Sequence, residues 1–334
     1  LIITSTGLQE SVAYSVGLYY KGTLAYSARA NLTGSVGTAE SYEKRIDAQR
    51  VETVMDKTVS IRTAEKSRTT TLTVLQDDQQ LLLLGPDNVW MPLPETGVVL
   101  SQKLAQYLNA GVGDAVRLWL AGDDEAIVTK VSAIAPIDIG LMAFMGRSQW
   151  EGFRKGEFTP SAILLLNPTE RGIETVDALD ELDSWEYPEQ QYLDTMTVLD
   201  AVTGVFKLMF FIALGLAFVM LYNMGILNFM ERSREYATLK VLGYHQKEIR
   251  RLITSENDLL TGLGVLLGIG PGFWLTGAIL ESCASKTMQF VPYVSWKTVL
   301  IGCVVTYAFS FFVTRFLARK VRGIDMVAAL KSVE

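Results

Sequence analysis

Three long apolar segments in the C-terminal part of the sequence constrain its fold more than any other feature. They comprise residues 205–229, 259–280 and 299–317. A helix needs about 20 mostly apolar residues to cross a bilayer, because hydrocarbon offers no partners for backbone polar groups. The charged Lys207 and Arg315 stand near segment ends, where long side chains can reach the membrane surface. We therefore predict transmembrane helices at 203–229, 258–281 and 298–318.

The distribution of Lys and Arg predicts how these helices are oriented. Basic residues are concentrated in 230–256 and in the tail, at Arg232, Arg234, Lys240, Lys247, Arg250, Arg251, Arg319, Lys320, Arg322 and Lys331. The connection 282–297 holds only Lys286 and Lys297. Because cytoplasmic loops carry the excess of basic residues, we expect 230–256 and the tail 319–334 to be cytoplasmic. Residues 25–200 then lie outside the cytoplasm.

Residues 25–200 have the pattern of an α+β domain. Short β-prone runs at 70–75, 81–84, 97–101, 115–120 and 125–134 alternate with turn residues. Helices are predicted at 102–109 and at about 169–182, the second with Thr169 as its N-cap. The loop 139–153 is unusually apolar, which favours a place in the core over a membrane-surface or contact site.

Composition excludes several classes of function. The net charge is −6 and the basic residues of the soluble half form no stripe with aromatics, so no nucleic-acid partner is expected. A single histidine, His245, and two cysteines make a metal site or cofactor unexpected. The spans contain no H-E-x-x-H and no paired carboxylates, which argues against a membrane-embedded hydrolase. No G-x-x-x-x-G-K-[ST] loop is present, so any ATP-driven cycle would need a separate ATPase, and we expect this chain not to be an enzyme.

The segment after the first span resembles a known family. It begins with Glu231-Arg232 and Glu235 and continues through Leu239 to Leu242-Gly243. This is similar to the E-R-x-x-E-x-x-x-L-x-x-L-G pattern of the FtsX-like permease family of ABC transporters, of the MacB and LolC/LolE type. The stretches 98–105, 111–118 and 324–331 also resemble the outer domain and the tail helix of that family.

The resemblance implies an α+β extracytoplasmic domain followed by an all-α membrane domain of three transmembrane helices, with a preceding transmembrane helix missing. Residues 1–24 would then be a stalk remnant, and the sequence would be the C-terminal permease unit of a longer chain or a single-unit member. The implied partners are a cytoplasmic ABC ATPase, a second permease unit in the same or a linked chain, and membrane lipid. The implied location is the bacterial cell membrane, as a multi-pass protein.

The cytoplasmic segment 230–256 is the predicted coupling site. Within 244–253, Ile249 and Leu252 fall on one helical stripe and basic residues elsewhere, the pattern of a short helix at the membrane surface. A lipid-facing helix without a protein partner would show the same pattern. The resemblance instead implies that this helix docks on the ATPase, and that 205–242 acts as a stiff lever. The predicted coupling residues are Glu231, Arg232, Glu235, Leu242, Gly243, Lys247, Ile249, Arg250, Leu252 and Glu256.

The second span carries a glycine stripe. Gly264, Gly268 and Gly272 recur at a spacing of four, which lets another helix approach closely, either within the chain or from another subunit. Pro271 is expected to kink this helix, because it removes a backbone hydrogen bond. Two functions share this architecture: export or extraction of a hydrophobic substrate such as a lipid, lipoprotein or peptide, and a non-transporting regulator that activates a cell-wall hydrolase or sensor.

Overall fold

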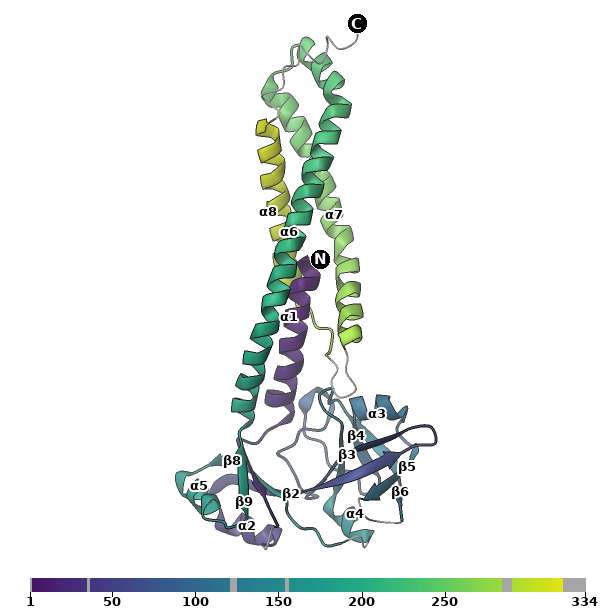
Figure 1. The fold of residues 1–334 in the computed structure, drawn as a ribbon, viewed down its shortest axis with the longest axis vertical. Coiled ribbons are helices and arrows are strands. Elements are labelled where there is room, and N and C mark those ends of the chain that lie inside the picture. The colour runs from purple at the N-terminus through teal and green to yellow at the C-terminus, as the bar shows by residue number, and fades with distance from the viewer. Residues whose placement is uncertain (1, 35–36, 121–124, 154–155, 284–289, 321–334) are drawn as a thin grey trace. The chain divides into compact units, whose positions relative to one another are not determined.

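The protein folds into two compact units in the computed structural model, which describes residues 2–34, 37–120, 125–153, 156–283 and 290–320 (Figure 1). The β-rich unit comprises Val12–Asp200 and Glu281–Val291. The helical unit comprises Leu1–Ser11, Ala201–Leu280 and Pro292–Glu334. The chain thus divides where the sequence changes from polar to apolar.

A nine-stranded mixed sheet, ordered β3-β7-β4-β6-β5-β2-β8-β1-β9, builds the β-rich unit. Its strands are β1 (Ala28–Leu32), β2 (Ala48–Arg62), β3 (Ser67–Leu75), β4 (Val98–Ser101), β5 (Ala115–Leu120), β6 (Ile127–Ala135), β7 (Met142–Gly146), β8 (Ala162–Pro168) and β9 (Leu182–Glu186). Strand β2 also pairs with β3, so six strands close into a ring while β8, β1 and β9 extend away from it. The long β2 serves both parts, pairing with β8 at its start and with β5 at its end.

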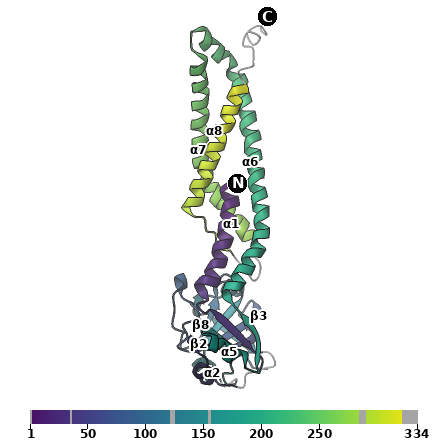
Figure 2. The same cartoon turned by 90° about the vertical axis from the view of Figure 1, so that its left-hand side faces the viewer.

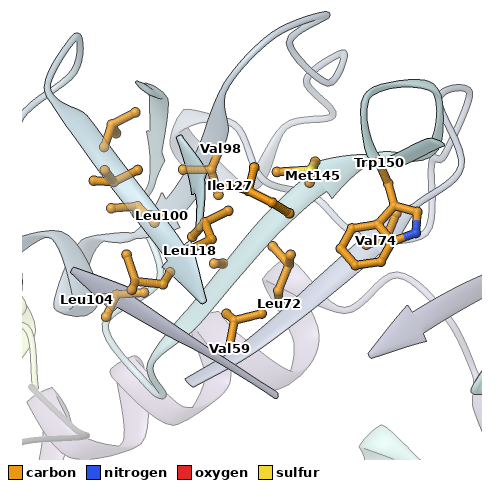
Figure 3. Packing of buried hydrophobic residues seen from close by; sticks show 14 of the residues in the cluster. Val59, Leu72, Val74, Val98, Leu100, Leu104, Leu118, Ile127, Met145 and Trp150 are labelled. Carbon is orange, nitrogen blue, oxygen red and sulfur yellow. The ribbon is translucent and has the colours of Figure 1, made fainter. Parts of the chain in front are cut away.

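The ring encloses the largest hydrophobic core (Figure 3). Val59, Leu72, Leu100 and Leu118 come from four different strands and are fully buried. Trp150, on α4 (Arg147–Gly152), is only 1% exposed and closes one side of the cluster. The apolar segment 139–153 is therefore core, as predicted, although it forms β7 and α4 and not a loop.

Three further helices complete the β-rich unit: α2 (Ala39–Arg45), α3 (Gln102–Leu108) and α5 (Glu170–Asp177). The predicted N-cap of α5 is confirmed, because Thr169 Oγ1 accepts a hydrogen bond from the Gly172 amide at 3.1 Å. Ser101 caps α3 in the same way. The prediction of an α+β fold is confirmed by this mixture of strands and short helices.

One predicted strand is wrong. Residues 81–84 form no named strand, and only Leu82 makes an isolated bridge, to Leu24. Leu81 and Leu84 are nevertheless buried in a second hydrophobic cluster. The apolar run reflects burial of a loop, which periodicity cannot distinguish from a short buried strand.

The helical unit is built on α6 (Pro188–Val241), α7 (Gln246–Cys283) and α8 (Trp296–Lys320), which lie side by side (Figure 2). Helix α1 (Ile2–Gly17) packs its first residues among them. Three segments, Pro188–Leu227, Asp258–Cys283 and Trp296–Arg315, are long and apolar enough to cross a membrane. The three predicted spans are therefore helical, as expected.

Candidate functional site: the long helix and its two ends

Helix α6 is the element that links the two regions of functional interest. It contains 54 residues, which at 1.5 Å per residue corresponds to about 80 Å. Its N-terminal end follows strand β9 after a single residue, Tyr187. Its C-terminal end leads directly into the turn around Gly243, which lies within the predicted coupling segment 230–256. No break interrupts the helix between these points.

The root of α6 is fixed to the sheet by a polar cluster. Asn31 Nδ2, on β1, donates to Glu186 Oε1 at 2.8 Å, and Glu186 Oε2 accepts from Gln191 Nε2, in the first turns of α6, at 3.3 Å. Arg29, also on β1, forms an ion pair with Asp56 of β2. Burial raises the pKa of the neighbouring Tyr26 phenol to about 12, so this group is neutral at physiological pH. The first turns of α6 are thus hydrogen-bonded to the end of β9, and β9 to β1.

Aromatic contacts add to this root. The rings of Trp185 and Tyr187 stack with centroids 5.8 Å apart, and Trp185 Nε1 donates to Asp177 Oδ1 at 2.8 Å. Asp177 ends α5, so α5 is joined to the strand that precedes α6. Backbone pairing continues the connection, since the Gln191 amide donates to the Tyr187 carbonyl at 2.9 Å.

The other end of α6 is a tight turn around Gly243. This glycine has a φ of +94°, a conformation that other residues rarely adopt. The Leu242 amide donates to Thr238 O at 3.0 Å and the Tyr244 amide to Leu239 O at 3.1 Å, which satisfies the last carbonyls of the helix. The Leu242-Gly243 pair of the sequence pattern thus ends α6.

Helix α7 begins immediately beyond this turn. The Glu248 side chain accepts a hydrogen bond from the His245 amide at 2.8 Å, and the Glu248 amide donates to His245 O at 2.9 Å. The Glu248 carboxylate thus caps the amide that precedes the helix, which is one half of a capping box, and the helix starts at Gln246. The lone histidine of the chain therefore occupies a cap position.

The prediction of a separate surface helix at 244–253 is wrong. Helix α7 continues without interruption from Gln246 to Cys283. The physical reason is that residues 246–258 contain neither Gly nor Pro, so nothing ends the helix before the apolar span begins. The amphipathic stretch is the first part of a long helix.

The predicted coupling residues lie on both sides of the turn. Glu231 and Glu235 are exposed on the last turns of α6, and Leu242 is 70% exposed at the turn itself. Tyr244 adds a second exposed apolar side chain beside it. The side chains of Arg232, Lys247, Ile249, Arg250, Leu252 and Glu256 lie outside the described residues, although their backbone is helical.

The glycines of α7 divide into two groups. A Cβ on Gly272 would lie 3.3 Å from Ile3 of α1, and Thr4 Oγ1 donates to the Gly272 carbonyl at 3.4 Å. Close approach through a small residue therefore occurs at Gly272. Gly264 and Gly268 have nothing within 4 Å of a built Cβ among the described residues. Pro271 lies inside α7, and its predicted kink stays a prediction.

Gly264 and Gly268 instead line a groove of about 660 Å³ in the helical unit. Its walls come from α1, α6, α7 and α8 and are mostly apolar, with hydroxyl side chains contributed by α7 and α8. The lining residues are Ile2, Ile3, Ala213, Leu216, Ala217, Met220, Leu221, Met224, Gly225, Leu260, Thr261, Gly264, Val265, Gly268, Gly302, Cys303, Thr306, Ser310 and Thr314. Within a bilayer such a space accommodates hydrocarbon or another helix.

The described part of the chain offers no group of three or more His, Cys, Asp or Glu side chains that could hold a metal ion.

Comparisons with known proteins agree with the sequence pattern. Residues 207–326, about a third of the chain, match the family model described as FtsX-like permease C-terminal. An uncharacterized ABC transporter permease protein of Mycobacterium tuberculosis is 28% identical over 208 residues, which cover 56% of this chain. The chain spans only 23% of the length of that relative. The protein is thus homologous to an ABC transporter permease.

Two solved structures are similar to about half of the chain. The periplasmic region of MacB from Actinobacillus actinomycetemcomitans is 12% identical and covers 53% of this chain and 95% of its own, with a TM-score of 0.33. The extracellular domain of the noncanonic ABC-type transporter YknZ from Gram-positive bacteria is 9% identical and covers 48% of this chain and 98% of its own, with a TM-score of 0.30. The permease domain and the three apolar helices fit a multi-pass membrane protein with a segment outside the membrane.

Proposed function

We propose that this chain is a permease unit that passes motion from a separate cytoplasmic ABC ATPase to the β-rich unit on the outer side of the membrane. The unbroken helix α6 carries this proposal. It joins a coupling turn within the FtsX-like domain to strand β9 of the sheet. A continuous helix transmits displacement along its axis because each turn is hydrogen-bonded to the next. ATP is bound by the partner, and this chain contributes no catalytic residue.

The outer location of the β-rich unit follows from the charge bias of the connections. A cysteine that replaces the exposed Glu174 of α5 should react with a membrane-impermeant thiol reagent in intact cells. A cysteine that replaces Tyr244 should react only after the membrane is opened. Both variants should carry Cys283→Ser and Cys303→Ser, because these are the natural thiols of the chain. The reverse labelling pattern would overturn the proposed orientation.

The groove favours transport or extraction of a hydrophobic substrate over a purely regulatory role. Its apolar walls suit the acyl chains of a lipid or lipoprotein, or an apolar peptide, and its hydroxyl side chains add a few polar groups. The natural partner in assembly is a second permease unit, and the surrounding lipid supplies or receives the substrate.

Replacing both Gly264 and Gly268 by leucine should fill the groove. Each new side chain has open space for its Cβ, so the helices need not move apart. We expect ATP-dependent substrate release to fall by about tenfold or more, while ATPase binding and ATP hydrolysis persist. The double variant Gly262→Leu, Gly270→Leu is the matched control, because it adds the same bulk to α7 away from the groove. Undiminished substrate release in the Gly264→Leu, Gly268→Leu variant would contradict a substrate groove. Loss of ATPase binding in that variant would contradict it too.

A further inference from the structure

The connection between α1 and β1 contains an unusual helical segment. Residues Leu18–Thr23 form the π-helix η1, which follows α1 directly. Such segments are rare and are frequent at functional sites. Within the β-rich unit, Lys21 of η1 places its ammonium group 4.0 Å from the ring centroid of Tyr192, in the first turns of α6. The connection that follows α1 and the first turns of α6 therefore touch at η1.

A tight turn lies against this π-helix. It is the short segment η2 (Pro86–Asn88), in which Asp87 has φ 55° and ψ 27° and Asn88 has a φ of 55°. Asp and Asn adopt this left-handed conformation more readily than other residues with a side chain, and the Val89 amide closes the turn by donating to Pro86 O at 3.2 Å. The Gly85 amide donates to Val89 O at 2.9 Å and closes the turn from outside.

The two segments approach closely at one point, where a side chain in place of Gly22 would require the Asn88 side chain to move. A Cβ on Gly22 would lie 2.1 Å from Asn88 Nδ2. The polar contacts here are long: Asn88 Nδ2 to Leu18 O is 3.5 Å, and Thr23 Oγ1 to Asn88 Oδ1 is 3.4 Å. Hydrogen bonds of this length are weak. Gly22 and Asn88 are therefore close in space, but only weak hydrogen bonds stabilise their contact.

The neighbouring backbone is held much more firmly. The Leu83 amide donates to Thr23 O at 2.9 Å, and the Ala25 amide donates to Leu81 O at 3.0 Å. The connection between α1 and β1 is thus held at Thr23 and Ala25 by short backbone hydrogen bonds. At Asn88 it is held only by long, weak ones, so displacement of α1 would be absorbed at η1 and η2.

We propose that Gly22 and Asn88 form a releasable joint, which closes η1 onto η2 in the conformation described and opens during the transport cycle. Asn88 is a positioning residue: it holds the exit of α1 without touching substrate. The proposal rests on the function proposed above, because it needs motion to arrive through the long helices. It adds the place where the β-rich unit yields to that motion.

A disulfide can lock this joint. A Cβ on Gly22 would lie 3.6 Å from the Asn88 Cβ, within the range of roughly 3.5–4.5 Å found across disulfides. The variant is Gly22→Cys, Asn88→Cys in a Cys283→Ser, Cys303→Ser background, in the full chain with its ATPase in membranes. We expect the disulfide to form on mild oxidation and ATP-driven substrate release to fall by about tenfold or more, with recovery on reduction. Equal release in the oxidised and reduced protein would overturn the joint, as would failure of the two thiols to pair.

A second pair of variants avoids cysteine chemistry and does not need the ATPase. Asn88→Gly removes the contacts with η1, whereas Asp87→Gly relieves a similar φ and leaves those contacts in place. Amide hydrogen exchange in 18–24 should accelerate by about tenfold or more in Asn88→Gly and stay unchanged in Asp87→Gly. Equal effects of the two variants would overturn the role of Asn88. If exchange responds as expected but the chain binds no ATPase, the proposed function fails while the joint stands.

Discussion

Replacing Ile249 and Leu252 together by aspartate is expected to abolish binding of the ATPase. The two positions are three residues apart on α7, so they share one face of the helix. Placing a carboxylate in an apolar docking surface costs roughly 3 kcal/mol or more. Because each 1.4 kcal/mol changes a binding constant tenfold, the affinity should fall by about 100-fold at least. The ATPase should no longer co-purify, and ATP turnover in membranes should be lost.

The control for this variant is Gln246→Asp. It introduces the same carboxylate at a polar position in the first turn of the same helix, where a negative charge is favourable. The double variant should still insert at wild-type levels, because neither residue lies in a predicted span. Normal ATPase binding and turnover at equal protein levels would show that this part of α7 faces lipid and has no docking role.

Replacing Val198 by proline is expected to disconnect the ATPase from the β-rich unit. Val198 is 68% exposed on α6, between the root of the helix and the apolar segment that starts at Val205. Proline inside a helix removes a hydrogen bond and clashes with the preceding turn, at a cost of about 3 kcal/mol. The helix should bend or break there, so axial displacement no longer reaches strand β9. ATPase binding and hydrolysis should persist while ATP-dependent substrate release falls to the level seen without ATP.

The matched control is Val198→Ala, which removes the same exposed side chain but keeps the helix. It should release substrate as the wild type does. Should Val198→Pro release substrate normally, a continuous α6 is not what couples the two units. Loss of ATPase binding in Val198→Pro would indicate a wider disruption of the helical unit.

Much of the helical unit could be predicted from hydrophobicity alone. The apolar runs located the three spans, because a lipid-facing helix must be apolar over its whole membrane length. They did not locate the helix ends. Helix α6 continues in both directions into polar sequence, and α7 begins at Gln246, 12 residues before the predicted span 258–281. Hydrophobicity marks the lipid boundary, whereas helix ends depend on caps such as His245 and Gly243.

The sheet was only partly predictable. Strand β5 matches its predicted bounds, because Ala115–Leu120 alternates buried and exposed residues over part of its length. Strand β2 was missed, since its 15 residues pass from one part of the sheet to another and the buried face changes along the way. Pairing of β3 with β7, which closes the ring, joins segments about 70 residues apart in sequence. Local pattern carries no information on such a pairing.

The coupling segment 230–256 was predicted through a resemblance and stays a prediction, and the groove was not predicted at all. Gly264 and Gly268 suggested close helix packing, yet the described neighbours leave their faces open. The spacing of Gly264 and Gly268 indicates that one face of the helix carries small residues. Whether that face receives a neighbour or borders a cavity depends on where α6 and α8 lie, which only the structure provides.

Movement of the β-rich unit in response to ATP is the most direct test of the account. Spin labels at Glu174 on α5 and at Lys297 near the start of α8 would report the distance between the two units by double electron–electron resonance. The assembled protein would be measured without nucleotide and with ATP bound to a non-hydrolysing ATPase partner. The account predicts a shifted distance distribution with ATP in the wild type and no shift in Val198→Pro. An identical distribution in the wild type with and without ATP would contradict it.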